Sequence, residues 1–73
     1  MKYKVYYNQD CQKYGIQALK ANINYQGDEP RWTQILIHNN KEVAPFQIKG
    51  KYVKCYTPYK GVAQRWLNEL IGV

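Results

Sequence analysis

The sequence predicts an α/β domain in the order β-α-β-α-β-β-α, with a central four-stranded mixed sheet and helices on both faces. Apolar residues alternate with polar ones in some segments and recur about every 3.6 residues in others, which is the pattern of alternating strands and helices. The chain has 73 residues, which is enough for one domain, and 45% of them are hydrophobic. Such a composition favours a folded chain over a disordered one.

The first half of the chain is expected to form a strand, a helix, a strand and a second helix. Residues Lys2–Tyr7 alternate charged and apolar side chains, which predicts a strand. Asp10 is then placed to cap a helix over Cys11–Asn22, and Ile23–Gln26 has the alternation of a short strand.

Residues 31–40 are more ambiguous. After the break at Gly27–Pro30, apolar residues follow a helical period from Trp32 to Asn39. The segment Thr33–Ile37 suits a strand nearly as well, because it is rich in β-branched residues. A helix is the favoured interpretation, and a strand is the alternative.

The second half is expected to form a hairpin and a helix. Phe46–Ile48 and Tyr52–Tyr56 read as strands joined by a turn at Lys49–Lys51. Thr57 and Pro58 are a typical N-cap and first helical residue. The apolar stripe of the last helix is formed by Tyr59, Ala63, Trp66, Leu67 and Leu70, and Gly72 is placed to end it.

Charge and cysteine content limit the setting and the partners. Eleven basic and five acidic residues give a net charge of +6, which favours acidic partners such as nucleic acid. Two cysteines are too few for a disulfide framework, and Met1–Asp10 lacks the apolar run of a signal peptide. No stretch approaches the roughly 20 apolar residues of a membrane span. We therefore expect a cytoplasmic protein with free thiols and no membrane partner.

Three segments carry a resemblance to a known family. Val5–Tyr14 is similar to the strand, loop and Cys-x-x-Cys segment of glutaredoxins. Val43–Pro45 and the following Phe46–Lys51 resemble the Val-Pro, strand and Gly-hairpin of that family, whose proline is cis. Cys55 and Tyr56 fall where the family has Gly-Gly or Ser-Gly. The chain therefore resembles glutaredoxins, which have the thioredoxin fold, and among them the small glutaredoxin-like hydrogen donors of ribonucleotide reductase.

The resemblance implies thiol–disulfide exchange with a disulfide-bearing protein or a small disulfide. Cys11 would be the catalytic thiol, and the substrate would lie against Lys13, Tyr14, Ala44, Pro45 and Tyr56. Because Tyr14 replaces the second cysteine of the motif, the chemistry would be of the monothiol type. Glutathione is the ligand that the family implies, but Asn8 and Cys55-Tyr56 depart from the residues that would hold it. No cofactor is therefore predicted.

The residues themselves support this chemistry if Cys11 begins a helix. A helix N-terminus favours a thiolate, and the thiolate is the attacking species in exchange. The alternative is an inert, buried Cys11. Cys55 is a possible second thiol that could pair with Cys11, or else a small apolar strand residue. His38 has no closely spaced ligand pair beside it, so no metal site is predicted.

A binding function is the alternative to redox chemistry. Basic residues and tyrosines alternate around the predicted hairpin, namely Lys49, Lys51, Tyr52, Lys54, Tyr56, Tyr59 and Lys60. Such interleaving suits a nucleic-acid backbone and its bases, whereas the favoured interpretation of these residues is a solvated hairpin whose tyrosines fill the core. A strand over Arg31–Ile37 would strengthen the nucleic-acid interpretation. A third possibility is a non-catalytic adaptor that binds a protein around Cys11 and Pro45.

Overall fold

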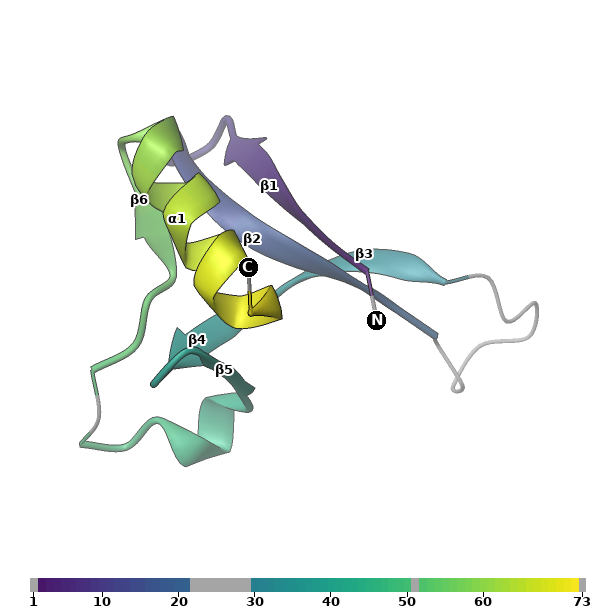
Figure 1. The fold of residues 1–73 in the computed structure, drawn as a ribbon, viewed down its shortest axis with the longest axis vertical. Helices are drawn as coiled ribbons and strands as arrows, with labels where there is room; N and C mark the ends of the chain where they lie inside the picture. The colour runs from purple at the N-terminus through teal and green to yellow at the C-terminus, as the bar shows by residue number, and fades with distance from the viewer. Residues whose placement is uncertain (1, 22–29, 51, 73) are drawn as a thin grey trace.

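The computed structural model describes residues 2–21, 30–50 and 52–72. These residues form mainly antiparallel strands, with one α-helix near the C-terminal end (Figure 1). The elements in chain order are β1 (Tyr3–Asn8), β2 (Lys13–Lys20), β3 (Arg31–Gln34), β4 (Leu36–His38), β5 (Lys41–Val43), the 3-10 helix η1 (Pro45–Gln47), β6 (Tyr56–Thr57) and α1 (Lys60–Ile71).

The strand β2 is the centre of a four-stranded sheet. It pairs with β1 along one edge, from Asn8–Lys13 to Tyr3–Ala18. On its other edge it pairs first with β6, at Tyr14 and Gly15, and further along with β3. All of these pairings are antiparallel. Segments far apart in the sequence are therefore joined by backbone hydrogen bonds to one strand.

The chain leaves the sheet after β3 and continues into a second, smaller hairpin. At the departure point the Ile35 amide still donates to the Ile16 carbonyl, at 3.1 Å. The strands β4 and β5 then pair around Asn39 and Asn40, which have φ values of 52° and 61°. A two-residue loop with both φ values positive suits the twist of a hairpin, and asparagine tolerates it better than most residues.

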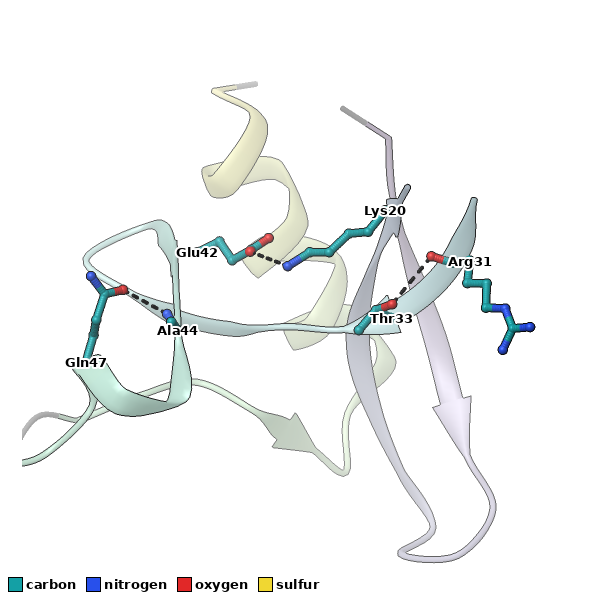
Figure 2. A network of polar contacts seen from close by, with 6 residues as sticks. All are labelled: Lys20, Arg31, Thr33, Glu42, Ala44 and Gln47. Atoms are coloured by element: carbon teal, nitrogen blue, oxygen red, sulfur yellow. Dashed lines mark hydrogen bonds and ion pairs between the residues drawn. The ribbon is translucent and has the colours of Figure 1, made fainter. Parts of the chain in front are cut away.

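Two polar contacts hold β5 and η1 in place (Figure 2). The Lys20 ammonium at the end of β2 lies 2.6 Å from the Glu42 carboxylate on β5, which ties the hairpin to the sheet. The Gln47 side-chain oxygen accepts a hydrogen bond from the Ala44 amide at 2.9 Å, which closes the short helix η1 on itself. Pro45 suits the first position of η1 because it has no N–H, and an N–H at that position would lack a partner within the helix.

The core lies between the sheet and α1, which contacts β1, β2 and β6 (Figure 1). Its buried residues are Ile16 and Ala18 of β2, Ile35, Ile37 of β4 and Ala63 of α1. Larger side chains pack around them, namely Tyr3, Val5, Tyr14, Trp66, Leu67 and Leu70. Gly72 ends α1 in the left-handed conformation that glycine adopts without strain, as predicted.

The predicted β-α-β-α-β-β-α fold with helices on both faces is wrong. Residues 13–20 of the expected first helix form β2, because Tyr14, Ile16 and Ala18 alternate toward the core at the strand period. Residues 31–40 form β3, β4 and a turn, so the strand alternative was the correct one. Within the described residues α1 is the sole α-helix, and it covers one face of the sheet.

Two further expectations fail around Pro45. Residues 45–47 form η1 instead of a strand, and Lys54 bridges Ile37 of β4 instead of pairing with residues 46–48. The peptide bond before Pro45 is trans, unlike that of the family proline. Thr57 belongs to β6, and α1 begins two residues later than predicted, after an N-cap at Tyr59. The predicted strand Ile23–Gln26 lies outside the described residues.

Candidate functional site: the helix-free face of the sheet

The face of the sheet opposite α1 carries basic, aromatic and amide side chains. Residues directly opposite each other in paired strands point to the same face, so the register assigns each residue to one side. No described helix covers this side (Figure 1), and every residue on it except Gly15 is exposed or half-buried. We call it the helix-free face, and it comprises Lys2, Lys4, Tyr6, Asn8, Lys13, Gly15, Gln17, Leu19, Trp32, Gln34 and Tyr56.

The centre of this face is a hydrogen-bond network around the Tyr56 hydroxyl. This oxygen accepts hydrogen bonds from the Tyr6 hydroxyl at 3.1 Å and from the Asn8 amide nitrogen at 3.0 Å. It donates its own proton to the Gln34 side-chain oxygen at 2.6 Å. A hydroxyl has one donor and two acceptor positions, so all three are used. The network therefore fixes side chains from β1, β3 and β6 relative to one another.

Gly15 provides the space in which the two tyrosines meet. A Cβ at this position would lie 3.0 Å from the Tyr6 ring, 3.1 Å from the Tyr56 ring and 3.1 Å from the Cys55 carbonyl oxygen. The rings contact each other edge to face, with centroids 6.4 Å apart. A glycine between paired strands thus permits the close approach that the network requires.

Asn8 connects the network to the turn between β1 and β2. Its side-chain oxygen accepts hydrogen bonds from the backbone amides of Asp10 and Cys11, at 2.8 and 3.3 Å. Asparagine commonly folds a turn back in this way. Cys11 is therefore an exposed turn residue and does not begin a helix, so the argument for a helix-stabilised thiolate does not apply to it.

None of the described residues that make up the helix-free face is acidic. The Lys4 ammonium lies 4.3 Å from the centre of the Trp32 ring, a cation–π contact that links β1 to β3. Of the three described acidic residues, Asp10 lies in the turn between β1 and β2, and Glu42 and Glu69 pair with Lys20 and Lys54, which are not on this face. The lysines of the helix-free face can therefore attract an anion to a position next to the aromatic rings of the same face.

Burial raises the pKa of Tyr6 well above its ordinary range, and the hydrogen bond that its hydroxyl donates to Tyr56 raises this pKa further. Burial also raises the pKa of the half-buried Cys55 thiol, and the charge of Cys11 adds to the effect. The Gln34 amide nitrogen donates to the Cys55 sulfur at 2.7 Å and opposes the shift. Both groups are therefore neutral near pH 7, and Cys55 is a weak nucleophile there.

The structure separates the residues that the sequence placed in one redox site. Cys11 lies in the turn before β2 and Lys13 begins that strand, whereas Ala44 and Pro45 lie at η1, at the opposite end of the molecule (Figure 1). Tyr14 faces the core side, where its ring lies 5.1 Å from that of Tyr7. Of the predicted site residues, Lys13 and Tyr56 lie on the helix-free face, and Cys55 contacts it through Gln34. Both cysteines are free.

Several residues of the helix-free face are not among the site residues predicted from the sequence, namely Tyr6, Asn8, Gly15, Trp32 and Gln34. The signal that could have found them is the period-two alternation across Lys2–Asn8 and Lys13–Lys20, read as two paired strands.

Comparison with protein-family models, curated proteins and solved structures gave no match. The glutaredoxin resemblance and thiol–disulfide exchange therefore stay predictions. Among the described residues, no three histidine, cysteine or carboxylate side chains group as metal ligands. None of the described helices has the length and apolar character needed to cross a membrane.

Proposed function

We propose that the protein is a nucleic-acid-binding module that holds a single strand on the helix-free face. The observation that carries this proposal is a sheet face with lysines and aromatic rings side by side and no carboxylate among its described residues. Lysines attract the phosphate backbone, and exposed aromatic rings stack on unpaired bases.

The geometry favours a single strand over a duplex. Trp32 is 38% exposed and lies beside Lys4, so one base can stack close to one phosphate contact. Bases within a duplex are already stacked on each other and cannot lie on a protein ring. The network around Tyr56 is satisfied internally, so it supplies a rigid floor that loses little entropy when a strand binds.

The salt dependence of binding is the first test. If Lys2, Lys4 and Lys13 each contact one phosphate, the slope of log affinity against log salt is about −2. Affinity for a labelled single strand, measured by fluorescence anisotropy, then falls about 20-fold between 50 and 200 mM salt. No binding at the lower salt concentration, or stronger binding of a duplex of the same sequence, contradicts the proposal.

Matched variants locate the site. Lys4→Gln should reduce the salt slope by about 0.7, whereas Lys41→Gln on β5 has the same net charge and should leave it unchanged. Trp32→Ala should weaken binding about fivefold or more through loss of a stacked base. Phe46→Ala removes an aromatic ring that is 83% exposed on η1, away from this face, and should have no effect. If Lys4→Gln and Lys41→Gln reduce the salt slope equally, the strand binds elsewhere on the protein. The same conclusion follows if Trp32→Ala and Phe46→Ala weaken binding equally.

A further inference from the structure

A pocket of about 300 Å³ lies beside the β4–β5 hairpin, outside the helix-free face. It is lined by Ile37 and His38 of β4, the turn residues Asn39 and Asn40, and Tyr52 and Lys54 of the segment before β6. Its volume is at the lower end for small-molecule sites, so it admits one small ring compound.

Backbone contacts hold the walls of this pocket together. Ile37 and Lys54 exchange two backbone hydrogen bonds, of 3.1 and 2.8 Å. The His38 Nδ1 lies 2.7 Å from the Tyr52 carbonyl oxygen. A carbonyl can only accept, so Nδ1 carries the proton, and in the neutral ring Nε2 is an acceptor. The site is therefore largely formed before a ligand arrives.

The charge of the pocket is nearly balanced. Among the described lining residues, Lys54 is the lysine, and its ammonium lies 3.3 Å from the Glu69 carboxylate on α1. An anion would compete with that carboxylate, so the pocket does not favour a bare phosphate. A neutral ligand that both donates and accepts hydrogen bonds fits it better.

The polar and aromatic groups define the shape of such a ligand. Within the described residues, the Asn39 and Asn40 side chains have no hydrogen-bond partner, so their amides can donate and accept. Tyr52 is 77% exposed and can offer the face of its ring. An asparagine amide pairs through two hydrogen bonds with the edge of adenine, and aromatic rings stack on any base.

We propose that this pocket binds a single nucleobase, with adenine as the preferred one. Tyr52 stacks on the base, and the asparagine amides hydrogen-bond to its edge. The base can belong to a free nucleotide or to a nucleotide within a strand, because the pocket recognises the ring and not the phosphate.

Amide chemical shifts in a titration with adenosine, AMP, uridine and inorganic phosphate test this proposal on the intact protein. Adenosine should shift the amides of residues 37–40 and 52–54, with a dissociation constant on the order of 1 mM. AMP should bind about as tightly as adenosine, uridine more weakly, and phosphate should leave these amides unshifted. Absence of adenosine shifts, or equal shifts with phosphate, overturns the proposal.

Variants that keep the fold assign the roles. Tyr52→Ala removes an exposed ring and should weaken adenosine binding about tenfold. Asn40→Gly keeps the positive φ of the turn, so the hairpin stays intact while the preference for adenosine over uridine is lost. Phe46→Ala and Trp32→Ala should leave adenosine binding unchanged, and the second of these separates the pocket from the helix-free face.

An oligoadenylate distinguishes the two sources of the base. If the oligonucleotide displaces adenosine from residues 37–40, the base comes from a strand; if adenosine remains bound, a free nucleotide is the ligand. Adenosine shifts that appear only on the helix-free face would place the base there and refute the pocket.

Discussion

Replacing Gly15 with alanine tests whether the tyrosine network depends on close approach at this position. The new Cβ would lie 3.0 to 3.1 Å from two tyrosine rings and one backbone carbonyl oxygen, so at least one of them has to move. Overpacking of this kind costs about 1–3 kcal/mol. Alanine also has less conformational freedom than glycine in the unfolded chain, which stabilises the folded state by about 0.5–1 kcal/mol.

The difference between the midpoints of these two ranges is a net loss of about 1 kcal/mol in the free energy of unfolding. For a domain of 73 residues this lowers Tm by about 4–8 °C, measured by circular dichroism. The matched control is Gly61→Ala in α1, where the new Cβ meets no atom within 4 Å. That variant should gain about 0.5–1 kcal/mol because alanine is the better helix former. A Gly15→Ala protein as stable as the wild type would refute the reasoning.

Three further predictions concern the same region. Tyr56→Phe leaves three polar partners without the hydroxyl they share, including Gln34, and should lower the free energy of unfolding by about 1–2 kcal/mol in urea; no change would mean that water replaces the hydroxyl. Iodoacetamide at pH 7.5 should alkylate the exposed Cys11 first and the half-buried Cys55 much more slowly, as followed by peptide mass spectrometry; equal rates would contradict the burial of Cys55. Because the pKa values of Tyr6 and Cys55 are raised by folding, their contribution to stability is complete at neutral pH and decreases as the pH rises above about 9. The double variant Tyr6→Phe, Cys55→Ala should flatten this decrease, and an unchanged pH profile would assign it to other groups.

Some elements could be predicted from the sequence because a local signal and the packing agree. The first strand alternates charged and apolar residues. In the structure, its pairing with β2 and its contacts with the core both agree with this alternation. The last helix has an apolar stripe that meets the sheet and a glycine that ends it. Tyr59 is the exception in that stripe, since it is 67% exposed and precedes the helix.

Other elements depend on partners that are distant in the sequence. Tyr14, Ala18 and Leu19 fit a helical spacing, but Ile16 and Ala18 are buried on the same side only if the backbone is extended. The segment forms a strand because β1 and β6 lie on either side of β2 and pair with it. A short window of sequence does not contain these partners, so it does not distinguish the strand from a helix. The same holds for the helix-free face, which gathers its side chains from four strands.

The strands β3 and β6 share one edge of β2, which has a consequence for folding during synthesis. β1 and β3 can pair with β2 as soon as the first half has been synthesised, but Tyr14 and Gly15 stay open on that edge until Tyr56 and Thr57 arrive. An open strand edge is a template for pairing between molecules. A nascent chain that stalls before residue 56 is therefore prone to associate with its neighbours, and the late docking of β6 and α1 closes that route.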